Sequence, residues 1–368
     1  MLLNFIKREA VLSAASLAAI ISAFFVLPDA KYISYIDFHT LALLLALMLT
    51  ISGAKKAGIF DIITAAMLNL VKTNRGLSVA LCALCFFSAM FITNDVALIT
   101  FVPLAVIVLP RENNDRLIIF SIVLMTIAAN LGSMLTPIGN PQNLYLYSYF
   151  SINTAEFFKT MAFPALMSLV LLLLANLFIN RSAAKKSENS APAFSNQLYI
   201  WAVLFVICVL CVGKFISWPV MLAIVLAVVF KTDRSLFKTA DYSLLLTFIA
   251  FFIFVGNMQR LEAVSALLSS MVKGRELAVS ILTSQVISNV PAAVLLSGFT
   301  ENYTDLLIGV NLGGLGTPIA SMASLISYKQ YAAAKNSHPA AYMKVFLIVN
   351  IAFLAVLWGL QIAANTIL

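Results

Sequence analysis

The chain alternates long hydrophobic segments with short polar ones. Uncharged stretches such as 161–180 and 345–367 extend over about twenty residues, the length of helix that crosses a bilayer core of roughly 30 Å. Inside lipid every backbone group needs an internal hydrogen-bond partner, so these stretches are expected to be α-helices. The pattern predicts spans near 9–28, 38–54, 117–150, 160–180, 198–214, 215–231, 243–259, 303–335 and 342–367.

Two of these spans, 117–150 and 303–335, are too long for one straight helix, and they share a motif: Asn-Leu-Gly, three further positions and Thr-Pro-Ile. Gly and Pro interrupt helices, and lipid tolerates irregular backbone only where it is buried in protein or lines a cavity. Each span is therefore predicted to be a broken helix, a feature that marks the binding site in many transporters. The motif residues are Asn130, Thr136 and Pro137 in the first copy and Asn311, Thr317 and Pro318 in the second.

Two other segments, 77–110 and 276–300, each consist of two hydrophobic arms around a polar tip. The tips are Thr93-Asn94-Asp95 and Ser288-Asn289-Val290. A helical arm of about 15 residues reaches only about 22 Å, which is too short to cross the membrane. We predict two re-entrant helical hairpins whose tips end inside the protein. The short stretches before them, 57–72 and 261–272, are expected to lie along the membrane interface.

These elements predict an all-α integral membrane protein with an inverted-topology repeat, two re-entrant hairpins and two broken transmembrane helices. The one long polar stretch, 181–197, is interpreted as a linker between the repeats because it is rich in Ser, Ala and Lys. The predicted units are an N-terminal span at 1–37, a first repeat at 38–180, the polar linker at 181–197, connecting spans at 198–242 and a second repeat at 243–368.

Composition and charge agree with a membrane protein. The chain is 62% hydrophobic and only 10% charged, and its net charge of +8 is better explained by cytoplasmic loops than by nucleic acid. With the amino terminus in the cytoplasm and the carboxy terminus outside, only six of the 23 Lys and Arg residues lie outside. The first hairpin then opens to the cytoplasm and the second to the outside. Lys7 and Arg8 precede an apolar run as in a signal peptide, but no small-residue cleavage site follows, so we interpret this run as an uncleaved span.

Several other classes of protein are disfavoured. The chain has no phosphate-binding Gly-x-x-x-x-Gly-Lys-Ser/Thr loop and no His/Glu/Cys catalytic constellation, so neither an enzyme nor a resident cofactor is expected. The cysteine pairs Cys82/Cys85 and Cys208/Cys211 lie in apolar helical stretches. They are interpreted as small hydrophobic residues rather than a zinc or redox site.

The tips and the breaks carry the polar chemistry expected of a membrane site. A cation that loses its water in lipid needs replacement oxygens from side chains and unwound carbonyls. The amino ends of the half-helices that follow the breaks attract negative charge or polar oxygen. The alternative is that these Asn and Thr residues only cap broken helices and join neighbouring ones. The oxygen ligands are predicted to come from Thr93 and Asn94 facing the Gly139 carbonyl, and from Ser288 and Asn289 facing the Ala320 carbonyl. The two helix amino ends are predicted after Asn140 and after Ser321.

At these residues the chain resembles the ion transporter superfamily, which includes arsenite permeases, citrate–metal carriers, sodium/proton antiporters and divalent anion/sodium symporters. The resemblance rests on the stretches 93–98, 136–143 and 288–289 and covers nearly the whole chain. It implies two cation sites, one from Asn94 with the Gly139 carbonyl and one from Asn289 with the Ala320 carbonyl. It also implies that Asn140 and Ser321 face the substrate, that the hairpins move like an elevator, and that the chain often forms a homodimer.

The chain departs from the dicarboxylate symporters, whose hairpin tips each carry Ser-Asn-Thr. The third tip position is Asp95 in one repeat and Val290 in the other. A carboxylate at membrane depth costs free energy unless it is paired or functional, and it would repel a dianion. Asp95 therefore favours a neutral oxyanion acid, a monoanion or a proton-coupled step over a di- or tricarboxylate. The alternative is that Asp95 only caps the second hairpin arm.

Three functional classes follow: a secondary anion or oxyanion permease, a cation/proton antiporter on the same fold, and a membrane scaffold or receptor without transport. The first is the leading hypothesis, with Na⁺ or H⁺ as the coupling ion and sodium as the only metal considered. The alternatives are a sodium/proton antiporter on the same fold or an arsenite-type efflux permease. The expected setting is a bacterial-type cytoplasmic membrane, with a small molecule or ion, lipid and a second copy as partners and no nucleic acid. The expected substrate-binding residues are Asn94, Asp95, Asn140, Asn289 and Ser321, and the expected coupling residues are Thr93, Asn94, Asp95, Gly139, Ser288, Asn289 and Ala320.

Overall fold

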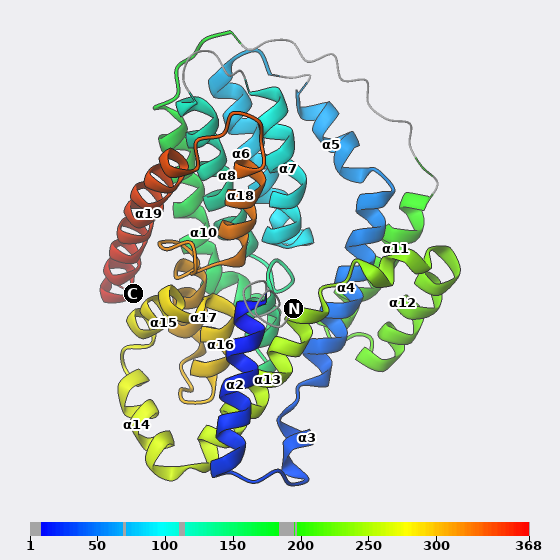
Figure 1. The fold of residues 1–368 in the computed structure, drawn as a ribbon, viewed down its shortest axis with the longest axis vertical. Helices are drawn as coiled ribbons and strands as arrows, with labels where there is room; N and C mark the ends of the chain where they lie inside the picture. Colours follow the sequence, from blue (N-terminus) through cyan, green and yellow to red (C-terminus); the bar gives the residue numbers. More distant parts are fainter. Residues whose placement is uncertain (1–8, 69–70, 110–114, 184–194, 196, 368) are drawn as a thin grey trace.

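The computed structural model describes residues 9–68, 71–109, 115–183, 195 and 197–367. Within these ranges all regular structure is helical, which confirms the all-α prediction (Figure 1). Thr73 and Ala183 form an isolated antiparallel bridge, but no strand is present in the described ranges.

The first part of the chain contains two broken helical units. The tip at Thr93 separates α6 from α7, and an unwound segment separates α8 from α9. The helices are α2 Ala10–Phe25, α3 Lys31–Tyr35, α4 Phe38–Lys56, α5 Ile59–Leu68, α6 Asn74–Ile92, α7 Asn94–Val108, α8 Arg116–Ser133, α9 Pro141–Tyr149 and α10 Thr154–Asn176.

The second part repeats this order after two connecting helices. The tip at Ser288 separates α15 from α16, and an unwound segment separates α17 from α18. The helices are α11 Gln197–Val212, α12 Trp218–Thr232, the 3-10 helix η1 Arg234–Lys238, α13 Tyr242–Arg260, α14 Glu262–Val272, α15 Glu276–Ile287, α16 Asn289–Ser297, α17 Tyr303–Leu312, α18 Met322–Ala332 and α19 Pro339–Ile367.

Six helices in the described residues are long and apolar enough to cross a membrane: α4, α6, α8, α10, α13 and α19. The prediction that both hairpins have short arms is wrong for α6, which has 19 residues. This helix begins earlier than expected because the Thr73 hydroxyl accepts a hydrogen bond from the Gly76 N–H and caps it. The arms of the second pair, α15 and α16, have 12 and 9 residues and are short as predicted.

The predicted linker at 181–197 is shorter on both sides than expected. The Ser182 carbonyl accepts a hydrogen bond from the Asn74 N–H, so the segment after α10 is joined to the start of α6. Gln197 already belongs to α11. The remaining linker residues, apart from Ser195, lie outside the described ranges.

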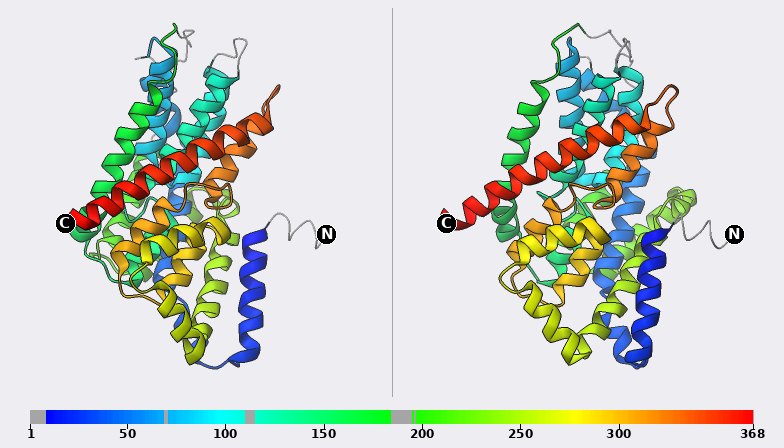
Figure 2. Two further views of the ribbon diagram at one scale, coloured as in Figure 1. Left: turned by 90° about the vertical axis from the view of Figure 1, so that its left-hand side faces the viewer. Right: turned by 60° about the vertical axis from the view of Figure 1, so that its left-hand side comes forward.

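The helices pack in matching pairs. The pair α6–α7 lies in the upper part of Figure 1 with α8, and the pair α15–α16 lies in the lower part with α17. Helix α2 packs along α13, and α11 and α12 pack against α4. Figure 2 shows α19 crossing the other helices obliquely. The opposite orientation of the two repeats in a membrane stays a prediction.

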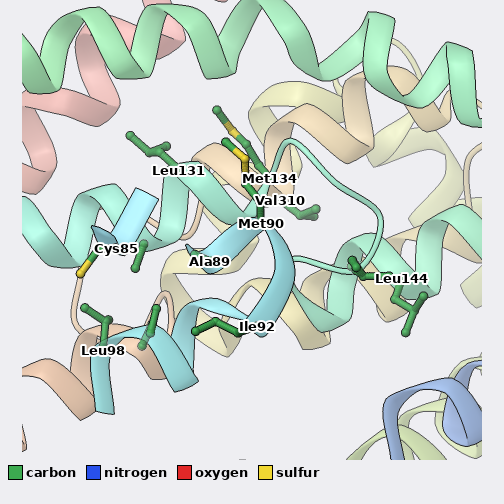
Figure 3. Close-up of a cluster of buried hydrophobic side chains, with 14 of the residues drawn as sticks. Cys85, Ala89, Met90, Ile92, Leu98, Leu131, Met134, Leu144 and Val310 are labelled. Atoms are coloured by element: carbon green, nitrogen blue, oxygen red, sulfur yellow. The ribbon is translucent and has the colours of Figure 1, made fainter. Parts of the chain in front are cut away.

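A hydrophobic core surrounds the first break (Figure 3). Met90 from α6, Leu98 from α7 and Leu131 from α8 belong to it, and Val310 of α17 reaches it from the second half. Cys85 is fully buried in the same core, and all four cysteines are free thiols, as expected for small hydrophobic residues. The backbones approach closely here, since a Cβ at Gly132 would collide with the Phe86 carbonyl.

Candidate functional site

The two hairpin tips share an unusual backbone conformation. Thr93 has φ 71° and ψ 151°, and Ser288 has φ 76° and ψ 155°. This region is essentially reserved for glycine and costs other residues about 1–3 kcal/mol. The same strain at equivalent positions indicates that the surrounding contacts impose this shape on both tips.

Each broken helix is tied to its own hairpin through the threonine of the repeated motif. The Thr136 hydroxyl donates a hydrogen bond to the Met90 carbonyl, and the Thr317 hydroxyl donates one to the Gln285 carbonyl at 3.2 Å. Both acceptors lie three residues before the tip. The Thr-Pro motif therefore fixes the unwound segment beside the tip in both halves.

The asparagines of the motif join the two halves to each other. The Asn130 Oδ1 atom accepts hydrogen bonds from Asn94 Nδ2 at 2.9 Å and from Ser321 Oγ at 3.0 Å. The Asn311 Oδ1 atom accepts one from Asn140 Nδ2 at 2.9 Å. Each motif asparagine thus binds the residue that precedes the second half-helix of the other repeat. The sequence predicted these residues as a group, and the structure brings them together.

A cavity of about 320 Å³ lies where the two tips meet the two half-helices. Asn94 and Asp95 line it from the first tip, and Ser288 and Asn289 line it from the second. Ser321 lines it from the start of α18, and α9, α2 and α13 complete the wall. The cavity therefore combines most of the predicted substrate-binding residues from both halves of the chain.

Three predicted site residues lie behind this wall. The Asn140 side chain is 1% exposed, caps α9 by accepting the Asn143 N–H at 2.9 Å, and donates to Ser133 and Asn311. Gly139 and Ala320 are buried in the unwound segments. None of these three lines the cavity, and neither does Thr93 of the first tip, a fourth predicted site residue.

The wall offers hydrogen-bond donors to a ligand. Asn289 is only 4% exposed, and its Nδ2 group makes no hydrogen bond to any described residue. The side chain of Ser321 does not cap α18, so the amino end of this helix stays available beside it. Asn94 differs, because its Nδ2 group is already bound to Asn130.

The cavity also carries charge. Asp95, Asp241 and Glu9 line it together with Lys329. The Oδ1 atom of Asp95 is buried without a hydrogen-bond partner among the described residues, whereas Asp241 caps α13 by accepting the Leu244 N–H at 2.9 Å. An acidic wall of this kind disfavours a multiply charged anion.

Sequence reasoning missed two amide side chains that hold the unwound segments. Asn143 donates through Nδ2 to the carbonyls of Met134 and Thr136, both at 3.0 Å. Gln285 holds the other segment from α15, donating to the carbonyls of Gly313 at 2.9 Å and Leu315 at 3.0 Å. The glycine-rich run 313–316 could have indicated such a residue. A run of this kind is not expected to stay helical, so its carbonyls need hydrogen-bond donors from elsewhere in the chain.

Comparisons with known proteins decide the family. A sequence profile described as "Citrate transporter" matches residues 1–303. The chain belongs to the citrate transporter family. This confirms the superfamily resemblance, and the family consists of membrane transporters. The profile match ends at Tyr303, the first residue of the second broken helix, so Asn311 and Ser321 lie beyond it.

Similar proteins also carry the names of transporters or of membrane proteins. An "Uncharacterized transporter MJ0456" of Methanocaldococcus jannaschii is 33% identical over 80% of this chain and 81% of its own length. The "Inner membrane protein YbiR" of Escherichia coli is 32% identical over 80% of each chain. A "Putative transporter arsB" of Dictyostelium discoideum is 27% identical over 45% of this chain and 28% of its own length.

A solved structure shares the fold. The crystal structure of the YdaH transporter of Alcanivorax borkumensis superposes with a TM-score of 0.56 and covers 91% of this chain and 88% of that chain. The two sequences are 13% identical, so the likeness concerns the fold alone.

Proposed function

We propose that this member of the citrate transporter family is an ion-coupled secondary transporter that moves a small anion or oxyanion across a bacterial-type cytoplasmic membrane. One observation carries the proposal: a single cavity is lined by Asn94 and Asn289 of the two tips and by Ser321 at a helix amino end. Pockets of roughly 300 Å³ and above hold small molecules. Sites built from broken helices near the middle of a repeat protein are typical of secondary transporters.

The chemistry of the wall favours a substrate with one negative charge or none. The free amide of Asn289 and the amino end of α18 donate hydrogen bonds to oxygen atoms. The carboxylates of Asp95 and Asp241 oppose a second negative charge on the ligand. A monoanion or a neutral oxyanion acid satisfies both groups of residues.

Alternating access would follow from the inverted repeat. Glu9 and Asp241 precede α2 and α13, the ends that the distribution of Lys and Arg places in the cytoplasm. In this proposed orientation the cavity faces the cytoplasm, since these two residues line it together with the tips. To expose it outside, the two hairpins and broken helices must move together past α2 and α13, which is an elevator-type motion.

A sodium/proton antiporter is the second candidate. The observation that favours it is the cluster of three carboxylates, Glu9, Asp95 and Asp241, around the cavity. An arsenite-type efflux permease agrees with the preference for a neutral oxyanion acid and with the likeness to the protein named arsB. In each alternative Asp95 exchanges the coupling ion.

Vesicle transport tests the proposal. The purified chain in liposomes is loaded with a sodium or a proton gradient, and uptake of labelled arsenite, monocarboxylates, sulfate and citrate is measured. We expect uptake of a monoanion or of the neutral acid of an oxyanion, and we expect Asn289→Ala to abolish it. Asn350→Ala is the matched control, because Asn350 is equally buried but donates only to the Phe346 carbonyl of its own helix.

The result that contradicts the proposal is gradient-driven exchange of sodium for protons without movement of any anion or oxyanion. That outcome selects the antiporter. Equal uptake by Asn289→Ala and wild type would show that the substrate does not bind in this cavity during transport.

A further inference from the structure

A second cavity, of about 810 Å³, lies at one end of the molecule among the ends of four helices. Its wall contains residues from the beginnings of α6, α8 and α19 and from the segment that follows α10. All four helices are long and apolar enough to cross a membrane, so in a bilayer this end of the bundle lies at the membrane surface. The distribution of Lys and Arg assigns that surface to the cytoplasm.

The cavity is an open wedge between α10 and α19. These two helices pack together near the end of α19 and diverge toward its beginning (Figure 2). Phe178, which is 85% exposed, lines the wedge after α10, Val345 lines it from α19, and Phe120 of α8 lies in the wall between them. The α10 side is fixed in place, because Asn74 Nδ2 donates to Ser182 Oγ at 2.8 Å. An apolar surface at the edge of a membrane is therefore presented in a preformed groove.

The charge in this wedge is positive. Arg116 at the start of α8 and Lys344 of α19 both line it, and every other described residue of the wall is neutral. Neither cation forms an ion pair with a residue in the part of the chain that the structure describes. Asp115 precedes Arg116, but its carboxylate contacts His338 Nε2 at 2.9 Å instead. The two positive charges are thus available to an anionic ligand.

A ligand that fits this wedge needs a negative group beside an apolar part. The guanidinium of Arg116 can bind two phosphate oxygens at once, and the ammonium of Lys344 adds a second positive charge. Free phosphate would meet both cations but would leave the apolar walls and most of the volume unfilled. A phospholipid supplies the phosphate and the acyl chains together, and basic pockets between transmembrane helices on the cytoplasmic side are sites of this kind. The positive field disfavours a headgroup that carries a cation of its own.

We propose that this wedge binds one anionic phospholipid, with its phosphate between Arg116 and Lys344 and an acyl chain against Phe178 and Val345. The site goes beyond the proposed transport and does not depend on it, because the wedge and the cavity at the hairpin tips have no described residue in common. A lipid held here bridges the end of α10 and the start of α19, which otherwise diverge. It joins both helices to the start of α8.

Thermal unfolding of the delipidated full chain in detergent tests this site, because a ligand that binds the folded state raises the unfolding temperature. Phosphatidylglycerol is compared with phosphatidylcholine of the same acyl chains and with inorganic phosphate. We expect phosphatidylglycerol alone to stabilise the wild type, and the double variant Arg116→Gln/Lys344→Gln to bind it at least tenfold more weakly. Phe178→Ser should also weaken binding, since it removes an acyl-chain contact. Lys231→Gln is the matched control, because Lys231 is an exposed lysine in the last turn of α12, and it should bind as the wild type does.

Equal stabilisation by phosphatidylcholine and phosphatidylglycerol would overturn the inference, as would unchanged affinity in the double variant. Stabilisation by inorganic phosphate as large as that by the lipid would assign the two cations to a soluble anion and would also overturn it. Arg116 and Lys344 are exposed, so their replacement is expected to leave the chain folded. The unfolding temperature without lipid verifies this for each variant.

Discussion

Replacement of Gln285 should weaken the second half of the site selectively. Its side chain makes three hydrogen bonds to the unwound segment: Nε2 to the carbonyls of Gly313 at 2.9 Å and Leu315 at 3.0 Å, and Oε1 from the Thr317 N–H at 2.9 Å. A polar contact between membrane helices contributes about 0.6 kcal/mol on average, and a typical hydrogen bond in protein about 1 kcal/mol. Gln285→Leu should therefore lower the free energy of unfolding by about 2–3 kcal/mol.

The functional effect follows from where these bonds lie. Without them the segment that presents Ala320 and Ser321 to the second tip loses its fixed position. We expect a higher KM for substrate and a smaller effect on kcat. The lost hydrogen bonds position the binding residues, whereas the motion of the hairpins does not depend on them directly. The assays are unfolding in increasing denaturing detergent and uptake by proteoliposomes.

Gln361→Leu is the matched control for this change. Gln361 is 5% exposed, and its Nε2 group donates only to Asn365 of the same helix. Its replacement should cost under about 1 kcal/mol and leave KM unchanged. If both leucine variants lose the same stability and transport equally well, Gln285 does not hold the site.

Further changes test other parts of the molecule. Thr93→Gly should relieve backbone strain and raise stability by about 1 kcal/mol in a thermal unfolding assay, yet weaken transport; a loss of stability would speak against a strained tip. Asp95→Asn should equilibrate substrate passively but lose accumulation and pH dependence in vesicles, whereas concentrative transport with an unchanged pH profile would assign Asp95 a capping role. A single cysteine at position 114 should be labelled from the cytoplasm and one at position 302 from the outside, because these positions follow the equivalent hairpins of the two repeats; labelling of both from the same side would exclude the inverted repeat. Hydrogen bonds from the Lys56 ammonium at 2.6 Å and from the hydroxyl and N–H of Ser235 lower the pKa of Asp233 to about 2, so their contribution to stability should be present at neutral pH and be lost between about pH 4 and pH 2; acid unfolding that is identical in Asp233→Asn would contradict this.

The sequence predicted the features that repeat and missed those that do not. Asn130 and Asn311 were recognisable because the same motif occurs twice, and both join the two halves in the structure. The unwound segments, however, are held by Asn143 in one half and by Gln285 in the other. These two residues come from different helices at unrelated spacings, so no periodicity connects them. Only the folded packing shows that they have the same role.

The start of α6 shows a different limit. The hairpin was predicted to begin at residue 77, but Thr73 caps the helix and Asn74 and Arg75 already belong to it. The Arg75 side chain donates to the carbonyls of Leu177 and Ile179 just after α10. The hydrogen-bond acceptors of this charged residue thus come from a segment about 100 positions later in the chain. Hydropathy alone could not predict that contact. Hydropathy also could not show that the Ala320 carbonyl accepts hydrogen bonds from the Asn289 N–H at 2.9 Å and from the Ser288 hydroxyl at 3.3 Å.

The hydrogen bonds between the halves set an order of events during synthesis. The contact between Asn74 and Ser182 closes within the first 183 residues, so the base of α6 can join the end of α10 early. Asn130, in contrast, waits for Ser321, which is 191 positions later, and Asn140 waits for Asn311, which is 171 positions later. Until then the Asn130 Oδ1 atom has only its bond from Asn94, and the Asn140 Nδ2 group has only its bond to Ser133, so each buried amide lacks one hydrogen bond that lipid cannot supply. A stalled or truncated chain is therefore expected to insert into the membrane and then be degraded. Only the second half supplies the remaining hydrogen-bond partners of Asn130 and Asn140.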